Sequence, residues 1–400
     1  AEEGGMLFDI IATCISSEQR SKVIVFEQGV IQTALKVASS QIGAKTEIAY
    51  RVTAAGLIDS FLTDFSSRTS LHSSTLPYIT EFIQAASVLL VNLSKLSDTD
   101  SSRFLWKGVR HCASILHIIA ASKHMRSTVE KSFTIKASDE DKFIPTQHPI
   151  GSILTMLATP PGSQLFPSNG IEEAREMLVQ TLVVFSTIPT FREYFTRFLK
   201  IEKDGPTSKV VASVAGVLLA IAQSPKTDTE ACRVLSLIAL FNATIVFDSN
   251  KSGHIDATYI GVVNAIQECH GITALVALSC GDIRSEGNNS WAVIQRAASL
   301  LSRCISCLHG DGSPRFNLCV ENRLIVIEAY VKIISQKLWN NFTGKANEVR
   351  TSIMETSVSL ILVIASGPLN NLPKGYALVN FAKALTESLP SPATNEAGKV

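Results

Sequence analysis

The sequence is short of charge and of aromatic residues, and neither is concentrated in one stretch. Charged residues make up 18% of the 400 residues and aromatic residues 7%, whereas hydrophobic residues reach 46%. The 36 Lys and Arg residues nearly balance the 35 Asp and Glu residues, and no run of five like charges occurs. This balance excludes a general affinity for nucleic acid or for an anionic membrane, so we expect no nucleic-acid partner.

Long apolar runs are also missing. The stretch SVAGVLLAIA (213–222) is among the longest and falls well short of the ~18–20 residues that cross a bilayer, so we expect no direct membrane insertion. The first residues, AEEGGMLFDIIATC, lack the basic segment of a signal peptide. They begin inside a helical pattern, so we expect the chain to be part of a larger chain or complex.

The eight cysteines are scattered, and most lie in apolar helical pattern. That distribution is typical of buried free thiols in a reducing compartment. We therefore expect an intracellular protein that works in the cytoplasm, in the nucleus or at the nuclear envelope.

Signatures of catalysis are absent. The sequence contains no G-x-S-x-G, H-E-x-x-H, G-x-x-x-x-G-K-[ST] or G-x-G-x-x-G motif. Its eight histidines are dispersed, and His111 and His117 are six residues apart in one helical region, so they do not share a face. We expect no enzyme and no cofactor.

One stretch, DSNKSGHIDATY (248–259), is similar to a calcium-binding loop. An EF-hand loop takes oxygen ligands at alternating positions and a glycine at the sixth, which matches Asp248, Asn250, Ser252, Gly253 and Asp256. Its last position normally holds a bidentate Glu, and here that position is Tyr259, whose phenol cannot replace a carboxylate. Asp, Asn, Ser and Gly are also ordinary turn residues. We therefore favour a turn between two helices, with a repeat boundary near 248–257, over a metal site.

A second candidate metal site is CISCLHG, with Cys304, Cys307 and His309, and with Cys319 further on. A pair of C-x-x-C motifs would be a strong zinc signal, but a single one near the end of an apolar helix is weak. We favour thiols of the core or of a groove over zinc.

Helical periodicity dominates the chain. Apolar residues recur at spacings of three and four in five segments: 79–96, 171–188, 227–247, 288–308 and 347–366. No convincing run of alternating strands with hairpin turns occurs, so we expect an all-α fold.

A phrase recurs in which a polar helical turn is followed by Gly and then by a short Leu-rich helix. The copies are 20–39 with Gly29, 101–122 with Gly108 and 262–281 with Gly271, and a weaker one is 49–66 with Gly56. A sharp turn between a short and a longer helix favours Gly, which carries no Cβ. Repeats of this kind cannot bury their apolar faces alone and must stack on their neighbours.

The chain resembles the armadillo repeat family, whose unit has a short first helix, a second helix that begins at Gly, and a long third helix with the phrase A-x-x-x-L-x-N-L. The segment AASVLLVNL (85–93) places Asn92 at the Asn of that phrase, and LSLIALFNA (235–243) places Asn242 there. By alignment, Ser186 and Cys304 take the same place in two further copies. HEAT-like repeats remain an alternative.

The resemblance implies one right-handed α–α superhelix of degenerate armadillo-like repeats over 1–390, with a tail or linker at 391–400. The polar stretch 122–170 is rich in Pro, Ser and Thr. We expect it to be a mobile surface insertion with a short helix near 149–158.

In armadillo proteins the third helices line a concave surface that holds an extended peptide or a helix, and Asn side chains there bind the guest backbone. The importin-α type adds a Trp four residues before each Asn. This chain has Val88, Leu182, Ile238 and Leu300 at those positions, which disfavours binding of nuclear-import cargo. The candidate partner-binding residues are Asn92, Asn242, Trp291 and Arg303, together with the 122–170 stretch.

We therefore predict a non-enzymatic protein-interaction scaffold that binds extended peptides or helices of protein partners. The alternative is a structural module of a large assembly, such as an α-solenoid nucleoporin, a ciliary or centriolar protein, or a coat-like component. An exchange factor or cochaperone is a third option, for which no specific residues stand out.

Overall fold

The computed structural model describes residues 2–16, 19–40, 45–63, 75–95, 102–123, 125–133, 143–144, 148–158, 170–202, 209–245, 257–284, 290–306, 325–326 and 355. The chain divides into two compact units, Ala1–Ala243 and Thr244–Val400. Each unit is described by itself below. The predicted tail at 391–400 and the predicted helix at 347–366 lie outside the described residues, apart from residue 355.

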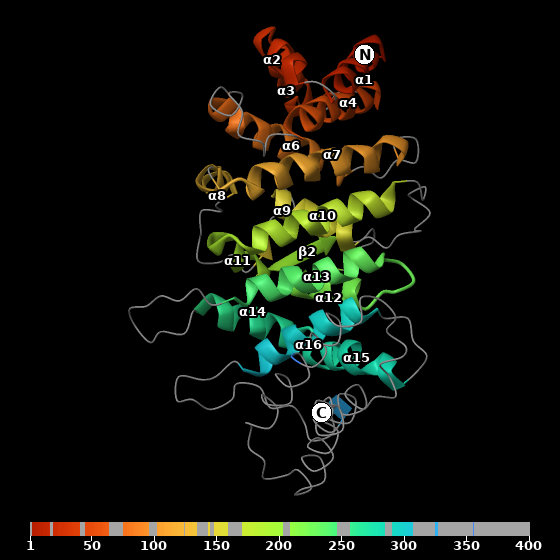
Figure 1. Cartoon of the computed structure of the whole chain (residues 1–400), viewed down its shortest axis with the longest axis vertical. Helices are drawn as coiled ribbons and strands as arrows, with labels where there is room; N and C mark the ends of the chain where they lie inside the picture. Colours follow the sequence, from red (N-terminus) through yellow and green to blue (C-terminus); the bar gives the residue numbers. More distant parts are fainter. Residues whose placement is uncertain are drawn as a thin grey trace, which may run out of the picture. The chain divides into compact units, whose positions relative to one another are not determined.

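The long helices of the first unit form one continuous layer, in which each helix packs against the next (Figure 1). This third-helix layer consists of α1 (Glu2–Ile15), α4 (Lys45–Leu62), α7 (Ser102–Ala121), α10 (Ile171–Ser186) and α13 (Glu230–Ala243). Because each of α4, α7 and α10 has a neighbour on both sides, its apolar residues are covered on both sides.

A second layer runs beside the first. It consists of α3 (Val30–Ser39), α6 (Ile79–Leu93), α9 (Pro149–Ala158) and α12 (Val214–Ala222), and each of these helices packs against its neighbours in the layer and against the third helix that follows it. Short helices precede them: α2 (Gln19–Glu27), η1 (Leu76–Tyr78), α8 (Arg126–Phe133) and α11 (Pro189–Phe195). The predicted α-solenoid of three-helix, armadillo-like units is therefore confirmed, with four such units over 19–243.

The second compact unit contains one further set of three helices among its described residues. These are α14 (Ala257–Glu268), α15 (Gly271–Arg284) and α16 (Trp291–Ile305), and α15 packs against both others. The first helix starts at residue 257, after the end of α13 at Ala243, so the expected repeat boundary falls between two sets of helices. Ser290 caps α16, because its side chain accepts a hydrogen bond from the Val293 backbone N–H.

The recurring glycines have two different roles. Gly29 has a φ of +74° and begins α3 after a tight turn, as predicted. At the turn before α15 the positive φ belongs to His270, at +55°, and Gly271 is the first residue of the helix. Gly56 and Gly108 are not turn residues, because each lies inside a long helix where a neighbouring helix comes close. The predicted turns at these two positions are therefore wrong.

Buried arginines tie the two layers together in three of the four units. Arg51, Arg175 and Arg233 lie in the first two turns of a third helix and are at most 3% exposed. Their guanidinium groups donate hydrogen bonds to backbone carbonyls in the last turn of the preceding second helix: those of Ala38 (2.9 Å), Leu157 (3.0 Å) and Ala222 (2.8 Å). The last carbonyl groups of a helix have no hydrogen-bond partner within the helix, and burying them unpaired costs free energy. The arginines therefore supply hydrogen bonds that these carbonyls would otherwise lack.

A small three-stranded sheet was not predicted. β2 (Phe198–Glu202) and β3 (Lys209–Ser213) form an antiparallel hairpin between α11 and α12, and β1 (Phe143–Ile144) pairs in parallel with β2. The sequence does carry a signal for it, since FLKIE and KVVAS are rich in strand-forming residues and the segment between them contains Asp-Gly, a dipeptide typical of turns. The sheet adds to an otherwise helical fold.

The structure also corrects the predicted insertion at 122–170. The expected short helix is present as α9, but its residues Ile150, Ile153 and Leu154 are at most 2% exposed. This helix lies in the second layer between α6 and α12, and α8 is the first helix of the same unit. The stretch therefore contributes part of a regular unit, with its remaining residues outside the described ones.

One segment, Leu76–Leu93, is long and apolar enough to cross a membrane by length and composition. Half of it is buried within the protein, and Phe82, Leu89 and Leu90 are at most 1% exposed against neighbouring helices. The bent pair α14–α15 passes the same criterion, with an angle of 79° between its halves. The apolar residues of α6 are thus engaged in contacts within the helical array.

Candidate partner-binding site

A hollow of the first unit lies on the third-helix layer, across α4, α7 and α10. It has a volume of about 360 Å³. We call it the third-helix pocket, and its lining residues are Asp59, Thr63, Arg110, Ser114, Glu173, Glu176, Met177 and Gln180. Its size is in the range of pockets that take a ligand, about 300–1,000 Å³.

The lining of the third-helix pocket is polar and carries an excess of negative charge. Three carboxylates face a single guanidinium, that of Arg110, which forms a 2.8 Å ion pair with Glu173. The two side chains of that pair are 45% and 69% exposed. An ion pair so exposed contributes only about 0–1 kcal/mol, so a charged guest can replace it at little cost.

Hydrogen-bonding groups lie on either side of this ion pair. The Gln180 side-chain amide donates to Glu176 Oε1 at 3.1 Å, and Thr63 donates to the Asp59 backbone carbonyl at 2.7 Å. Ser114 is half-buried on α7. The pocket therefore presents acceptors and donors from three successive units, which suits a polar, extended guest.

A buried Asp–His pair lies at the inner edge of the pocket. Asp59 Oδ2 and His111 Nδ1 are 2.7 Å apart, and both residues are 8% exposed. A Cβ on Gly56 would lie 3.2 Å from His111 Nε2, so the backbone of α4 closes off that nitrogen. The pair joins α4 to α7 and fixes the inner wall of the pocket.

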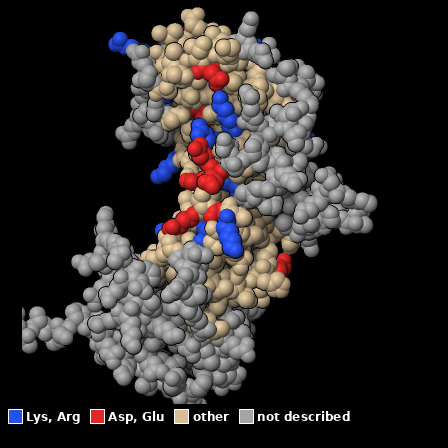
Figure 2. All heavy atoms as spheres, turned by 90° about the vertical axis from the view of Figure 1, so that its right-hand side faces the viewer, with Lys and Arg blue, Asp and Glu red and all other residues tan. Residues whose placement is uncertain are grey.

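Another ion pair extends this charged surface towards the N-terminus. Lys107 of α7 reaches Asp9 of α1 at 3.5 Å, although α4 packs between these two helices. Figure 2 shows acidic and basic side chains gathered in a band on one face of the molecule, beside uncharged surface. Such mixed charge favours polar guests over apolar ones.

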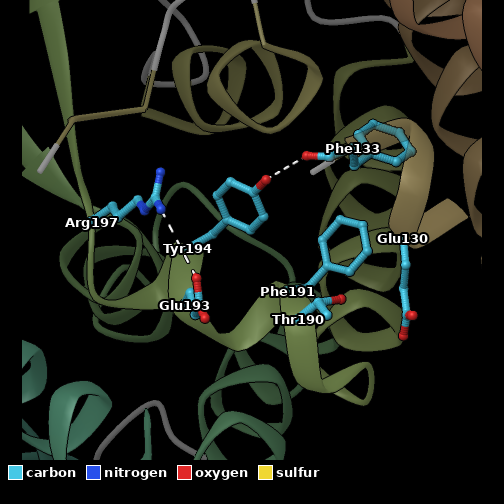
Figure 3. Close-up of a pocket in the computed structure, with 7 residues that line it drawn as sticks. All are labelled: Glu130, Phe133, Thr190, Phe191, Glu193, Tyr194 and Arg197. Atoms are coloured by element: carbon cyan, nitrogen blue, oxygen red, sulfur yellow. Dashed lines mark hydrogen bonds and ion pairs between the residues drawn. The ribbon is translucent and has the colours of Figure 1, made fainter. Parts of the chain in front are cut away.

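A second, smaller hollow lies between α8 and α11 (Figure 3) and has a volume of about 140 Å³. Phe133, Phe191 and Tyr194 form its floor, and these rings are at most 6% exposed. The Tyr194 hydroxyl donates to the Phe133 carbonyl, and the Arg197 guanidinium lies 5.5 Å from the Tyr194 ring. The rings are therefore part of the core, and the hollow is small for a ligand site.

His148 belongs to the same aromatic cluster. Its ring stacks on Tyr194 at 5.3 Å, its Nε2 lies 3.1 Å from the Phe133 carbonyl, and its Nδ1 accepts a hydrogen bond from the Ile150 N–H. An Nδ1 that accepts is unprotonated, so this histidine is neutral with its proton on Nε2. Burial also lowers the pKa of His148. The cluster stabilises the α8–α9–α11 region and offers no charged acceptor of its own.

The structure separates the predicted partner-binding residues. Asn92 lies on α6, which belongs to the second layer, so its assignment to a third helix is wrong. Asn242 lies in the last turn of α13, in the third-helix layer. Both side chains are half-buried, but they stand in different layers. The aligned positions Ser186 and Cys304 are fully buried and belong to the core.

Trp291 and Arg303 lie in the second unit, at opposite ends of α16. Their 12-residue separation corresponds to about 18 Å along a helix. The Arg303 carbonyl accepts a 2.8 Å hydrogen bond from the Tyr259 hydroxyl. These residues do not form one site with each other, and a binding role for any of the four residues stays a prediction.

Tyr259 also bears on the proposed calcium loop. It is 7% exposed, and its hydroxyl is engaged with α16, so the twelfth loop position is part of the core. Asp248, Asn250, Ser252 and Asp256 lie outside the described residues, as do Cys307, His309 and Cys319. Within the described part of the chain, no group of three His, Cys, Asp or Glu residues could hold a metal ion.

The pocket residues could not be found from the sequence. Asp59 and His111 are 52 residues apart, and Arg110 and Glu173 are 63 apart. Only acidic residues at the start of α10 gave a hint, and they also suit the helix dipole.

Comparisons with known proteins identify no close relative: no protein-family model matches the chain, and no curated protein matches it. Among solved structures, a computationally designed armadillo repeat protein for modular peptide recognition has 11% identity and a TM-score of 0.36, and the match covers 87% of this chain and 99% of that one. An engineered protein has 15% identity and a TM-score of 0.35, covering 97% and 91%. Both TM-scores are below 0.5, so neither likeness carries an argument about function, and the solenoid is established by its own helix contacts.

Proposed function

We propose that this protein is a non-enzymatic protein-interaction scaffold that holds a partner segment on its third-helix layer. The observation that carries the proposal is the third-helix pocket, a 360 Å³ hollow built by three successive units. A repeated array presents equivalent surface from unit to unit, so a guest that follows the layer can contact several units at once.

The charge of the pocket indicates the chemistry of the guest. With Asp59, Glu173 and Glu176 against Arg110, the lining carries a formal charge of −2 from three acids and one base. A Lys or Arg side chain from an extended segment complements this charge and can take the place of Arg110 beside Glu173. Gln180 and Ser114 then remain as hydrogen-bonding groups for the backbone of the segment.

The Asp59–His111 pair is consistent with a non-enzymatic scaffold. The Asp59–His111 pair has the form of an orienting carboxylate beside a base, which activates a nucleophile in some enzymes. Here His111 Nε2 is enclosed by α4 and, in the described part of the chain, it hydrogen-bonds to no hydroxyl or thiol. The neighbouring Cys112 is buried, and desolvation, followed by the charge of Asp59, raises its pKa far above the usual range, so it stays protonated.

A selection experiment tests this function. Peptides of about twelve residues would be selected from a phage-displayed library on the purified chain, and their affinities measured by calorimetry. We expect basic residues among the binders and a loss of affinity of about tenfold in the Glu173→Lys, Glu176→Lys double variant, since reversing two lining charges repels a cation.

The matched control is Glu172→Lys, which changes an exposed acid of α10 that does not line the pocket. We expect this variant to bind within about twofold of the wild type, because exposed charges outside the pocket interact weakly. Selected peptides without basic residues, or equal losses in both variants, would contradict the proposal.

A structural module of a large assembly is the second candidate function, in the sense of an α-solenoid nucleoporin, a ciliary or centriolar protein or a coat-like component. One observation favours it, namely that Met6, Leu7 and Ile10 of α1 are more than half exposed. We also propose an intracellular location, because Cys112 and Cys232 are buried thiols that form no disulfide.

A further inference from the structure

The carboxylate of Asp59 forms part of the wall of the third-helix pocket, and one of its oxygens is unpaired. Asp59 is 8% exposed and lines the pocket together with Thr63 of the same segment. Its Oδ2 lies 2.7 Å from His111 Nδ1, whereas its Oδ1 is buried and accepts no hydrogen bond from the described residues. A buried charged group that lacks a hydrogen-bond donor costs more free energy than an uncharged one.

His111 holds this carboxylate in place without neutralising it. A histidine that is protonated on both ring nitrogens needs an acceptor for each of them. Nδ1 has the Asp59 oxygen, but Nε2 is buried and has no hydrogen-bond partner among the described residues. A Cβ added to Gly56 would lie 3.2 Å from Nε2, so α4 closes that side of the ring. These surroundings favour the neutral ring with its proton on Nδ1, and Asp59 keeps its negative charge.

The arginines of the same two helices are engaged with other groups. Arg110, which precedes His111 in α7, pairs with Glu173 of α10 at 2.8 Å. Arg51, about two turns before Asp59 in α4, donates to the Ala38 carbonyl at 2.9 Å. Among the described residues, no Lys or Arg forms an ion pair with Asp59. The pocket therefore presents a buried negative charge that a cationic guest can neutralise.

We propose that the third-helix pocket is a lysine site, in which the ammonium group of a Lys of the partner segment binds Asp59 Oδ1. This inference rests on the proposed function, because it names the side chain by which the partner segment is recognised. Ser114 of α7 lines the same pocket, and its hydroxyl oxygen provides a second acceptor. The apolar stem of the lysine packs beside Met177 of α10. Since Oδ1 is buried, the ammonium displaces part of the lining, and the flexible Met177 and the exposed Arg110 are free to turn aside.

The remaining oxygens of the pocket favour lysine over arginine. A guanidinium binds best to both oxygens of one carboxylate, whereas an ammonium is a compact charge with three donors that needs no such pair. Each carboxylate of the lining already has one oxygen engaged: that of Asp59 with His111, that of Glu173 with Arg110, and that of Glu176 with Gln180. An arginine guest beside Glu173 would also replace one guanidinium by another, with little gain.

Peptide variants test lysine against its closest substitutes. A peptide selected on the chain would be synthesised with Lys, Arg or acetyl-lysine at each basic position in turn, and its affinity measured by calorimetry. At one position we expect Arg to weaken binding about fivefold and acetyl-lysine at least about tenfold, because acetylation removes the charge. Equal affinities of the Lys and Arg peptides at every position overturn the lysine site and leave the scaffold in place. A chain that binds no peptide at all overturns both.

The ratio of the Lys and Arg affinities shows which carboxylate holds the lysine. Asp59→Asn keeps the shape of the side chain but removes its charge, so it should bring the two peptides within about twofold of each other. Glu176→Gln, the matched control on α10, should weaken both peptides by the same factor and keep their ratio. A general structural loss also weakens both peptides alike, so a changed ratio is specific to the contact. An unchanged preference for Lys in Asp59→Asn overturns the assignment.

A variant that needs no guest keeps the proposal testable where Asp59→Asn does not fold. Ser114→Lys supplies an ammonium group from within the pocket, and Ser114→Met supplies a long side chain without charge. We expect Ser114→Lys to unfold about 2–4 °C above Ser114→Met, because it neutralises a buried carboxylate. It should also bind the Lys peptide at least about tenfold more weakly than Ser114→Met does, since its own ammonium occupies the site. Equal unfolding midpoints, or equal affinities, overturn the proposal.

Cadaverine, a free diamine, tests the source of the ammonium group. We expect it to displace the Lys peptide only at a concentration at least about a hundredfold above that of the peptide, because it lacks the contacts that a segment makes with several units. Displacement at an equal concentration would show that the pocket takes a small amine, and it would overturn recognition of a lysine within a protein segment.

Discussion

α1 and α7 both belong to the third-helix layer, but their surroundings differ. α7 lies between α4 and α10, and nine of its apolar residues are at most 3% exposed: Leu105, Trp106, Val109, Cys112, Ala113, Ile115, Leu116, Ile119 and Ala120. α1 has one third-helix neighbour, α4, and leaves Met6, Leu7 and Ile10 more than half exposed. Both helices are apolar on several sides, a pattern that is typical of buried helices.

The difference in burial reflects the number of neighbouring helices that each helix contacts in its layer. Inner helices gain stability from two interfaces, whereas α1, with one third-helix neighbour among the described helices, gains it from one. The same residue types are therefore buried in α7 and partly exposed in α1. Substitutions in matched pairs, one on each helix, test this contrast.

The largest contrast is expected for truncated leucines. Leu116→Ala in α7 removes a side chain that is 1% exposed, and it should lower the free energy of unfolding by about 2–5 kcal/mol through lost burial and a cavity. Leu7→Ala in α1 removes one that is 55% exposed and should change the free energy by less than about 0.5 kcal/mol. Urea unfolding followed by circular dichroism measures both. Similar losses in the two variants would show that α1 is as buried as α7.

Replacing each of two glycines by Ala should change the stability of the protein in opposite directions. A Cβ on Gly108 of α7 would lie 2.7 Å from Val52 Cγ2 and 2.8 Å from Leu93 Cδ1, so Gly108→Ala should destabilise the chain by about 1–3 kcal/mol despite the better helix propensity of Ala. On α1, a Cβ on Gly5 meets nothing nearer than Thr53 Oγ1 at 3.4 Å. Gly5→Ala should therefore stabilise by about 0.5–1 kcal/mol. Thermal unfolding midpoints of the two variants give the signs, and a stabilising Gly108→Ala would refute the close approach.

The smallest effect concerns pH. Desolvation in α7 lowers the pKa of His117 below its ordinary 6.5, against an opposing hydrogen bond to the Gln180 backbone. The unfolded chain therefore binds the proton first as pH falls below about 6.5, and stability decreases from there down to the lower pKa of the folded state. His117→Gln should flatten the fall in unfolding midpoint between pH 7.5 and 5.5, with the part due to His148 remaining. An unchanged slope would show that His117 is solvated, as residues of α1 are.

The helical elements themselves follow from local pattern. The predicted helices at 79–96, 171–188, 227–247 and 288–308 are present as α6, α10, α13 and α16, each within a few residues of its expected ends. Apolar spacing and helix-start residues are enough for this, because both act within one turn of the chain. The hairpin β2–β3 was missed because its two short strands lie within a chain dominated by helical pattern.

The layers and the pocket could not be predicted in the same way. Asn92 matches the A-x-x-x-L-x-N-L phrase of a third helix as well as Asn242 does. Its helix, α6, nevertheless belongs to the second layer: η1 is the short first helix of the same unit, and α7 is its third helix. The phrase predicts an apolar helix end, but it does not predict the layer to which the helix belongs. Glu173 meets Arg110 only because α10 packs against α7 in one register, which depends on the side chains of both helices.

The sequence by itself determined a helical chain with little charge, the glycine turn before α3 and apolar helices that need neighbours, because these properties depend on composition and on contacts within a few residues. Only the tertiary structure decided which helices form each layer, which carboxylates gather at the third-helix pocket, and that the outer side of α1 stays exposed. These depend on contacts between segments 50 or more residues apart, such as the 52 that separate Asp59 from His111. Local periodicity cannot encode such a register, since many alignments of two apolar helices bury similar area.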